Sequence, residues 1–281
     1  MLLRRWRRRP ETDPADLAPF ADLRPMVVVT GASEGIGYAL ARRFARAGHD
    51  VMLIARRAEP LEQAAAAIRA DYKVEAVTVP LDVAAAHAIP EIDRALAKCG
   101  AYADVLVNSA GIGYAGAFHN QALDELLKLV DVNVRALTAL TRHYLLGMLI
   151  RGRGGILNVA SVGGLTPGPY QAAYYATKAY VISLTEALAS EASPSRGVRV
   201  SVLAPGPVRT GWHDRAGARS AFYRYLLPAS TEAVARAGYV GYLLRLRVIV
   251  PGLMSPLLAL ALRIMPHRLT SPVVRVLLRP R

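Results

Sequence analysis

The sequence predicts an α/β fold of the Rossmann type, a doubly wound parallel sheet with helices on both faces, in a single domain. Short runs rich in Val, Ile and Leu alternate with longer helical patterns from residue 25 onward. Because these runs are apolar on both faces, they indicate parallel strands covered on both sides. A glycine-rich turn leads from the first run into the first helical pattern. With 281 residues, of which 53% are hydrophobic and 20% charged, the chain can bury a large core, which excludes disorder.

The individual elements are expected in strict alternation. Strands are expected at residues 26–30, 50–55, 74–83, 104–111, 154–161 and 198–205. Helices are expected at residues 34–48, 59–72, 87–100, 121–150 and 173–192. Gly48 ends the first helix, and Pro60 suits the first turn of the second. The fourth helix is amphipathic, and its apolar side is expected to carry Leu123, Leu126, Leu127, Val130, Val134, Leu137 and Leu140.

Charge divides the chain into three parts. We expect a basic segment at 1–24, a globular domain at 25–238 with a flap near 211–230, and a basic, apolar extension at 239–281. The formal net charge is +14, from 35 Lys and Arg and 21 Asp and Glu. Residues 1–10 hold five Arg and residues 233–281 hold eight, both without an acid, whereas the remaining residues hold 22 bases and 21 acids. The basic character therefore belongs to the two ends.

Two basic ends favour contact with an anionic surface such as a membrane. A nucleic-acid-binding fold would carry its basic stripe on a structured face, so no nucleic-acid partner is expected. The apolar stretch at 248–262 is fifteen residues long, whereas a spanning helix needs about 20. It therefore suits an interfacial segment rather than a transmembrane one. The alternative is that the extension packs on the domain, covers the sheet edge or forms a contact between subunits, with its arginines solvated.

Targeting and redox signals point to the cytoplasm. Pro10 and Pro14 stand where a signal peptide would carry its apolar region. The single cysteine, Cys99, excludes an intrachain disulfide and suits a reducing compartment. Cys99 has no Cys or His at ligand spacing, so no metal site is expected. We therefore expect a cytoplasmic protein, membrane-associated if the basic ends bind lipid.

The glycine-rich turn is the first candidate binding site. It reads Thr30-Gly31-Ala32-Ser33-Glu34-Gly35-Ile36-Gly37. Glycines in such a turn let the backbone bend sharply and approach a pyrophosphate, which binds the free N–H groups of a helix N-terminus. The pattern alone also fits a tight turn between a strand and a helix. Its place at the start of a doubly wound sheet favours dinucleotide binding.

Further motifs follow in order along the chain. They are Asn108-Ser109-Ala110-Gly111 after the fourth strand, Asn133 in the long helix, Ser161 after the fifth strand, Tyr174 and Lys178 in a Tyr-x-x-x-Lys motif, and Pro205-Gly206-Pro207-Val208-Arg209-Thr210 after the sixth strand. Together with the TGxxxGxG turn, these motifs resemble the short-chain dehydrogenase/reductase family over residues 25–212. Ser109 stands where that family usually has a second asparagine, and its hydroxyl suits the same supporting role.

The Tyr-x-x-x-Lys motif carries acid–base chemistry. Tyr174 and Lys178 are four residues apart, so they share one face of a helix. An ammonium beside a phenol favours the phenolate and lowers the phenol pKa from about 10. Tyr174 can then exchange a proton with a carbonyl or alcohol oxygen. Tyr170, Tyr175 and Tyr180 lack a lysine four residues later and are expected in the core.

The resemblance implies roles for the other members of the site. Ser161 would hydrogen-bond the same oxygen as Tyr174, Lys178 would also reach the nicotinamide ribose, and Asn133 would hold a water in a proton relay. Without the tyrosine motif, Ser161 would read as a turn residue at the end of a strand. The predicted catalytic residues are Tyr174, Lys178, Ser161 and Asn133, with no metal.

The end of the second strand predicts the choice of cofactor. NAD enzymes place an acid there, but this sequence reads Ala55-Arg56-Arg57. A guanidinium suits a 2′-phosphate in charge and geometry, so we expect NADP(H) to be preferred over NAD(H). Alternatively, the two arginines only begin a solvated helix, and Glu34, where some NADP-preferring relatives have a base, weakens the case. The predicted cofactor contacts are Gly31, Ser33, Glu34, Ile36, Gly37, Arg56, Asp82, Val83, Asn108, Ala110, Gly111, Tyr174, Lys178, Pro205, Gly206, Val208 and Thr210.

The predicted function is interconversion of a ketone and a secondary alcohol by hydride transfer with NADP(H). The extension at 239–281 resembles in character the 3-oxoacyl-CoA reductase and 17β-hydroxysteroid dehydrogenase-like branch of the family. The substrate is therefore expected to be apolar, a 3-oxoacyl chain or a steroid-like molecule. The resemblance also suits a homodimer or homotetramer. The alternative is a catalytically silent, membrane-associated sensor of NADP with the same fold, which would not need the complete set of catalytic residues.

Overall fold

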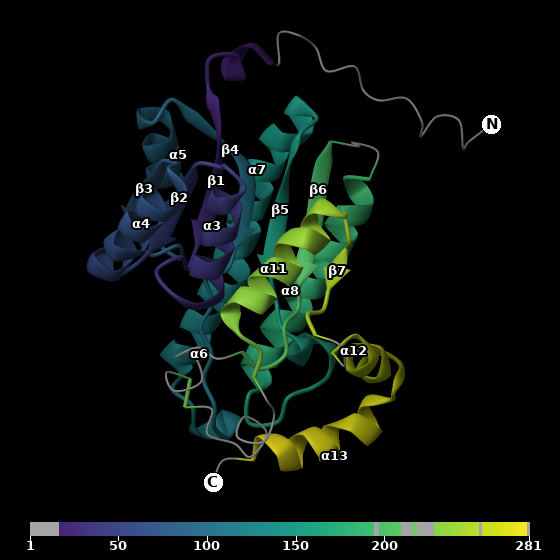
Figure 1. The fold of residues 1–281 in the computed structure, drawn as a ribbon. Coiled ribbons are helices and arrows are strands. Elements are labelled where there is room, and N and C mark those ends of the chain that lie inside the picture. The colour runs from purple at the N-terminus through teal and green to yellow at the C-terminus, as the bar shows by residue number, and fades with distance from the viewer. Residues whose placement is uncertain (1–16, 194–196, 209–215, 218–227, 253–254, 280–281) are drawn as a thin grey trace, which may run out of the picture.

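A seven-stranded parallel sheet forms the centre of the molecule (Figure 1). The computed structural model describes residues 17–193, 197–208, 216–217, 228–252 and 255–279. The strand order is β3-β2-β1-β4-β5-β6-β7, and all pairs are parallel. The strands are β1 (Arg24–Thr30), β2 (Val51–Ala55), β3 (Ala76–Pro80), β4 (Ala101–Asn108), β5 (Gly154–Val159), β6 (Val198–Leu203) and β7 (Val248–Ile249). The order reverses between β1 and β4, as in Rossmann-type sheets, so the predicted fold class is confirmed.

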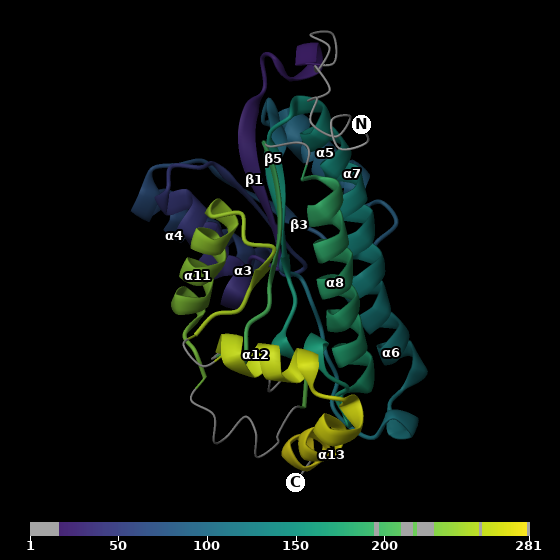
Figure 2. The ribbon, with the colours of Figure 1, turned by 90° about the vertical axis from the view of Figure 1, so that its right-hand side faces the viewer.

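Helices cover both faces of this sheet (Figure 2). One face carries α3 (Gly35–Arg46), α4 (Ala58–Tyr72) and α11 (Thr231–Leu243). The other face carries α5 (Ala88–Lys98), α6 (Leu123–Val130), α7 (Leu137–Arg151) and α8 (Ala172–Glu191). Short helical turns lie at η1 (Ala18–Phe20), η2 (Phe118–Asn120) and η4 (Val162–Leu165). The three layers follow from strands that are apolar on both faces and must be covered twice.

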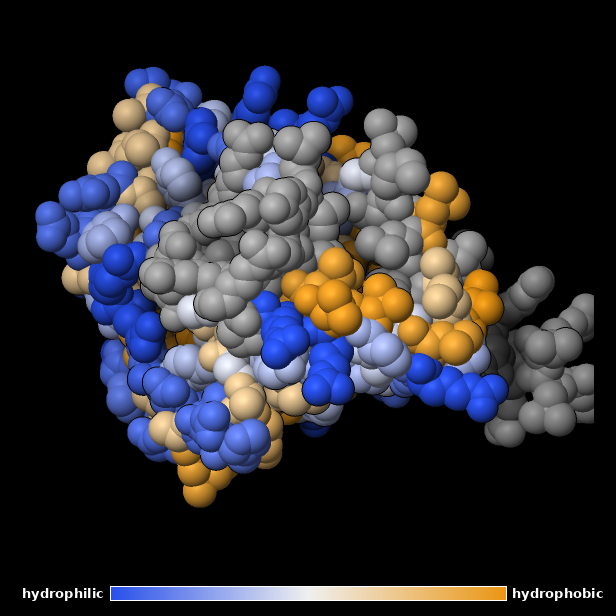
Figure 3. All heavy atoms as spheres, turned by 90° about the horizontal axis from the view of Figure 1, so that it is seen from below, coloured by the Kyte–Doolittle hydropathy of each residue, from blue (hydrophilic) through white to orange (hydrophobic). Residues whose placement is uncertain are grey.

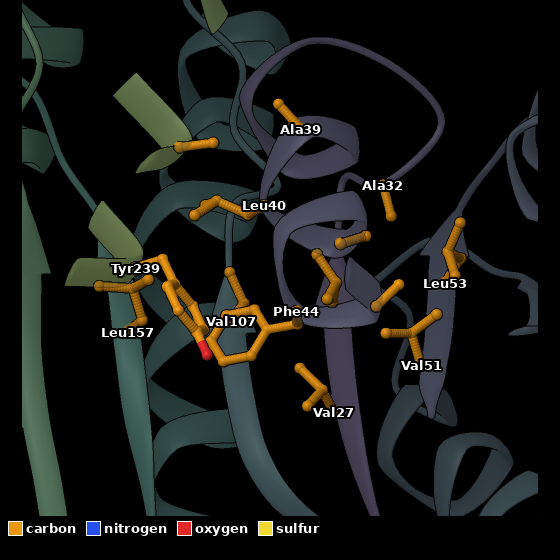
Figure 4. Packing of buried hydrophobic residues seen from close by; sticks show 14 of the residues in the cluster. Val27, Ala32, Ala39, Leu40, Phe44, Val51, Leu53, Val107, Leu157 and Tyr239 are labelled. Carbon is orange, nitrogen blue, oxygen red and sulfur yellow. The ribbon is translucent and has the colours of Figure 1, made fainter. Parts of the chain in front are cut away.

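The core between the sheet and α3, α4 and α11 is closely packed (Figure 4). Phe44 of α3 is fully buried and meets Tyr239 of α11 edge to face, with ring centroids 5.0 Å apart. Val27 and Val107 lie beneath this pair in the sheet. Full burial of such an apolar side chain contributes roughly 1.5–3 kcal/mol. Because Tyr239 belongs to this core, the boundary predicted at residue 238 falls inside α11 rather than between two structural units.

The long helix predicted at 121–150 consists of α6, a π-helical segment at Asp131–Ala136 and α7. The expected apolar side already divides within α6, before the π-helical segment begins. The single apolar side that we predicted is therefore wrong. Leu126, Leu137 and Leu140 are buried, whereas Leu123 and Leu127 are exposed.

The last part of the chain folds over the carboxyl ends of the strands. α12 (Ser255–Ile264) and α13 (His267–Leu278) lie across the lower end of the molecule (Figures 1 and 2). Thr270 of α13 is buried and its Oγ1 lies 3.1 Å from that of Thr166. Arg263 of α12 forms an ion pair with Glu186 of α8, with a shortest distance of 3.1 Å. The extension therefore packs on the domain.

Candidate active site

A cavity of about 820 Å³ opens at the carboxyl ends of the strands. Its walls come from the glycine-rich turn, the ends of β2, β4, β5 and β6, the first turns of α8, and the helices α12 and α13. Crevices outside the carboxyl ends of parallel strands, where the strand order reverses, are the usual ligand sites of such sheets. The cavity is therefore the candidate active site.

The glycine-rich turn is packed too closely for larger residues. Gly31 has φ +66°, a left-handed conformation that favours glycine. A Cβ on Gly37 would lie only 2.2 Å from the carbonyl oxygen of Gly31. The hydroxyl of Thr30 accepts hydrogen bonds from the backbone N–H groups of Ser109 and Ala110, at 3.1 Å each, and so ties the turn to the end of β4. The glycines at the N-terminus of α3 thus bring backbone to the cavity surface, as close approach of a pyrophosphate requires.

Tyr174, Lys178 and Ser161 all line this cavity. The ammonium of Lys178 lies 5.6 Å from the centre of the Tyr174 ring. Ser161 follows β5, and its Oγ accepts a hydrogen bond of 3.1 Å from the backbone N–H of Gly163. This contact fixes the serine oxygen at the end of the strand. The three predicted side chains therefore meet at one wall.

Burial perturbs the lysine of this group. Lys178 is buried, and its Nζ donates to the backbone carbonyl of Val159 at 3.0 Å. Within the described ranges, no Asp or Glu lies in ion-pair distance of it. Desolvation lowers the pKa of Lys178 to about 8. The group is thus close to its titration point near neutral pH, as an acid–base system requires.

Asn133 connects two of the segments that border the cavity. It lies in the π-helical segment, where its Nδ2 donates to the Ile112 carbonyl at 2.9 Å and to the Thr177 hydroxyl at 3.1 Å. Its Oδ1 accepts from the backbone N–H of Ile112 at 3.0 Å. A Cβ on Gly111 would lie 3.4 Å from both this Oδ1 and Lys178 Nζ. Asn133 itself is not among the residues that line the cavity. Its contacts join the loop at Ile112 to α8, and its catalytic role through a relay water remains a prediction.

Thr177 was not predicted as a site residue. Its hydroxyl donates to the carbonyl of Tyr174 at 2.8 Å and accepts from Asn133. It thereby connects the catalytic helix to the π-helical segment. Its place between the tyrosine and the lysine of the motif could have singled it out, although threonine is common in such positions for other reasons.

The opposite end of the cavity carries the arginines that follow β2. Arg56 and Arg57 are exposed and line the cavity. Arg57 forms an ion pair of 2.7 Å with Glu34 of the glycine-rich turn. Asp82 also lines the cavity, and its Oδ1 accepts from the backbone N–H of Ala84 at 3.0 Å, which shapes the turn after β3. Arg56 has no such pairing with an acid among the described residues.

Most predicted site residues line the cavity. They are Gly31, Ser33, Glu34, Ile36, Gly37, Arg56, Asp82, Val83, Ala110, Gly111, Ser161, Tyr174, Lys178, Pro205, Gly206 and Val208. Thr210 and most of the flap predicted near 211–230 lie outside the described residues. Of the neighbouring tyrosines, Tyr175 is buried as expected, but Tyr180 is exposed and lies 2.8 Å from Thr138 through its hydroxyl.

Asn108 lies below the cavity rather than in its lining. It is buried, and its Nδ2 donates to Thr141 Oγ1 at 3.0 Å and to Asn158 Oδ1 at 2.9 Å. Asn158 in turn donates to Thr185 at 3.0 Å. This polar chain joins β4 and β5 to α7 and α8. The side chain of Asn108 therefore supports the strand ends beside the cavity, and the cofactor contact predicted for this residue remains a prediction.

The apolar wall of the cavity was not predicted residue by residue. It comes from Ala261 and Met265 of the α12 region and from Thr270, Val273, Val274, Leu277 and Leu278 of α13. The sequence signal was an apolar tail without a motif, which fits many arrangements. Among the described residues there is no cluster of three or more potential metal-ligating side chains, and none of their helices has the length and apolarity to cross a membrane.

A Rossmann-type sheet with a Tyr-x-x-x-Lys pair beside a glycine-rich turn defines a class of dinucleotide-dependent oxidoreductases. Residues 25–220 match the sequence model of the family described as short chain dehydrogenase. The chain belongs to this family, as the motifs predicted.

Individual relatives agree with this assignment. The chain is 36% identical over 194 residues to very-long-chain 3-oxoacyl-CoA reductase-B of Danio rerio, which covers 68% of this chain and 61% of that one. It spans about three fifths of the length of the curated relatives that it matches first. A short-chain dehydrogenase from Sphingobium yanoikuyae in complex with NADPH superposes with a TM-score of 0.77 at 33% identity, covering 88% of this chain and 95% of that one. The bulky-bulky ketone specific alcohol dehydrogenase from Comamonas testosteroni gives 0.70 at 27% identity, with 90% and 92% covered.

Proposed function

We propose that this protein interconverts a ketone and a secondary alcohol with NADP(H), and that Tyr174 exchanges the proton with the substrate oxygen. The observation that carries the proposal is the meeting of Tyr174, Ser161 and Lys178 at a wall between a glycine-lined end and an apolar end of one cavity. One end suits a dinucleotide and the other an apolar ketone.

The residues present fit a nicotinamide dinucleotide. The close approach of Gly31 and Gly37 leaves the backbone N–H groups of α3 open to a pyrophosphate. Arg56 supports binding of a 2′-phosphate, because no acid among the described residues pairs with it and β2 ends without a carboxylate. The NADPH-bound relative from Sphingobium yanoikuyae supports the same cofactor.

The cofactor would supply or accept the hydride, and the protein's own groups would manage the proton. In the reductive direction, the hydride joins the carbonyl carbon while Tyr174 gives its phenolic proton to the oxygen, which yields the alcohol. Ser161 hydrogen-bonds that oxygen and holds it beside the phenol. Lys178 stabilises the phenolate that remains, because its ammonium lies over the tyrosine ring. Asn133 keeps the loop at Gly111 and the helix of Tyr174 in register.

The substrate class follows from the apolar wall. Val274 and Leu278 of α13 face the cavity, and the side chains of Met265 and Leu277 extend this surface. Such a wall favours an apolar chain or ring system over a sugar. Relatives named as a reductase of very-long-chain 3-oxoacyl-CoA and as a dehydrogenase of bulky ketones support this class.

The test is to follow NADPH absorbance with a panel of ketones that includes 3-oxoacyl thioesters, steroid-like ketones and short polar ketones. We expect oxidation of NADPH with the apolar members and little with the polar ones. Oxidation with none of them, or with short polar ketones only, would overturn the corresponding part of the proposal.

The same measurement separates the enzyme from a catalytically silent sensor. A sensor would bind NADPH, as seen by the fluorescence of the nucleotide, but would turn over no member of the panel in either direction. The complete set of Ser161, Tyr174 and Lys178 in one cavity favours the enzyme.

A further inference from the structure

Helix α13 carries apolar side chains on two opposite sides. Thr270 and Leu278 are buried on the inner side, and Val274 lines the cavity between them. On the outer side, Leu269 is 57% exposed and Val276 is 75% exposed. A surface helix of a soluble domain normally presents polar residues to water. The outer side of α13 is therefore built for contact with something other than water.

The neighbouring helix extends this surface. We define the α12–α13 patch as the exposed apolar residues Leu257, Ile264, Met265, Leu269, Val273 and Val276. Seen from below, hydrophobic residues gather on this end of the molecule beside basic ones (Figure 3). Several large exposed apolar side chains on neighbouring helices favour an interaction site.

The charges around the α12–α13 patch indicate which kind of partner it binds. Arg268 and Arg275 are exposed, and at helical spacing both fall on one edge of the outer side of α13. Residues 233–281 contain no Asp or Glu. The same segment of a second copy would therefore offer these arginines no opposite charge. An anionic lipid surface complements both the apolar side chains and the arginines.

The patch is continuous with the cavity. Met265, Val273 and Leu277 line the cavity and are also exposed to solvent. These three residues form an apolar rim between the interior and the patch. A surface that docks on lipid here would bring the rim to the bilayer.

We propose that the α12–α13 patch docks on an anionic membrane surface, and that the apolar substrate passes between the bilayer and the cavity through the rim of Met265, Val273 and Leu277. The passage of substrate rests on the proposed function, whereas the docking does not. Separate experiments can therefore overturn the docking and the passage.

Docking is tested by co-sedimentation of the full chain with vesicles. The probes are phosphatidylcholine vesicles with and without phosphatidylserine, at low and high salt. The variants are Leu269→Asp with Val276→Asp, and Arg268→Gln with Arg275→Gln. Arg94→Gln with Lys98→Gln is the matched control, because these basic residues are exposed on α5 at the opposite end of the molecule. All of these positions are exposed, and a melting curve checks that each variant folds.

We expect the wild-type protein and the α5 control to bind the anionic vesicles. Each basic residue near an anionic surface contributes about fivefold in partitioning, so Arg268→Gln with Arg275→Gln should weaken binding by roughly 25-fold. The double aspartate variant should bind no more than trace amounts at any salt concentration. Equal binding by all variants, or no binding by the wild type at low salt, would overturn the proposal. If the patch variants changed the sedimentation coefficient of the protein but not its binding to vesicles, the proposal would also be overturned. The patch would then be assigned to a contact between copies of the chain.

Passage through the rim is tested by supplying one ketone in vesicles and a water-soluble analogue without them. The double aspartate variant should lose at least tenfold in rate with the vesicle-borne ketone and keep its rate with the soluble one, since neither Leu269 nor Val276 lines the cavity. Equal rates of variant and wild type on the vesicle-borne ketone would overturn the passage. Failure of the wild type on both ketones would instead count against the proposed function.

Discussion

The two ends of the cavity are built on different principles. The end at the glycine-rich turn consists of backbone and strand ends, packed so closely that a single Cβ on Gly37 would meet a carbonyl at 2.2 Å. The end at α12 and α13 consists of apolar side chains from helices that follow the last strand. Tyr174 and Lys178 lie where the two ends meet.

One end of the cavity is set by backbone positions that tolerate few substitutions, and the other end is set by side chains that can vary. A dinucleotide has a fixed shape, so the surface for it depends on backbone positions that only a few residues permit. The proposed apolar substrate would instead contact side chains of α13, where the volume of the cavity changes with each substitution. We therefore expect changes at one end to leave the properties of the other end intact, and the following experiments test this.

The largest effect is expected at the junction. Tyr174→Phe keeps the ring but removes the group that gives the proton, so turnover should fall by about 100-fold to 10,000-fold, while the Kd for NADPH should change little. Steady-state rates and nucleotide fluorescence measure the two quantities. Tyr180→Phe is the control on the same helix, since Tyr180 is exposed and its hydroxyl lies beside Thr138. Retention of more than a third of the turnover by Tyr174→Phe, with chemistry limiting the rate, would remove Tyr174 from this role.

The buried ammonium gives the second effect, on stability. Burial holds the pKa of Lys178 at about 8, below its ordinary value of 10.5. Between these values the unfolded chain binds a proton that the folded protein does not, so this group makes the free energy of unfolding rise with pH. Below about pH 8 both states are protonated and the contribution is lost. Between about pH 8 and pH 10.5, the contribution of Lys178 to the free energy of unfolding changes by roughly 3 kcal/mol.

Urea unfolding of the cofactor-free protein at pH 7 and pH 10 measures this contribution. Lys178→Met is the reference, since the other titrating groups cancel in the difference between the two proteins. We expect the stability of the wild type relative to Lys178→Met to be higher at pH 10 than at pH 7. The same difference at both values would show that Lys178 has an ordinary pKa.

A change at the substrate end should act on substrates alone. Val274→Trp adds volume to the wall of the cavity on α13, so the KM for a bulky ketone should rise by about tenfold or more, while a small ketone is still accepted. The Kd for NADPH is the control and should stay within a factor of two, on the order of the scatter in such measurements. A parallel loss of NADPH affinity would show that the two ends are coupled.

The smallest effect is expected at the far end of the dinucleotide site. Arg56→Ala should weaken binding of NADPH by about tenfold and leave NADH unchanged, because only NADPH carries the 2′-phosphate. Arg57→Ala is the matched comparison, because Arg57 already forms an ion pair with Glu34. We expect this variant to lose less NADPH affinity than Arg56→Ala. Titration of both cofactors by fluorescence measures this. Equal weakening of NADPH and NADH, or a wild-type preference for NADH, would contradict the assignment of Arg56.

Most residues that the motifs singled out do line the cavity, because the requirements of these motifs are local. Gly31 and Gly37 are set by backbone geometry within one turn, and Tyr174 and Lys178 by one turn of helix, so spacing alone identifies them. Six of the strands were predicted near their observed places for a similar reason, as each is an apolar run of ordinary length.

What depends on long-range packing was predicted less well. The two-residue strand β7 is too short to leave a pattern, and it exists because Val248 and Ile249 pair with β6. The hydrogen bonds of Asn108 with Asn158 and Thr141 were not predicted, because these partners come from distant segments. The cover formed by α12 and α13 is fixed by contacts such as Thr166 with Thr270, which no spacing reveals.

The short strand β7 has a consequence for how the tail of this protein could be exchanged. Only two residues pair with β6, and beyond them the chain leaves the sheet to form α12 and α13. The segment of α12 and α13 is attached to the sheet only at its start and otherwise contacts the domain through side chains. Such a segment can be replaced as a unit. Grafting a different tail after Ile249 would then change the wall of the cavity formed by α12 and α13 and leave the glycine-rich turn and the Tyr174–Lys178 pair in place.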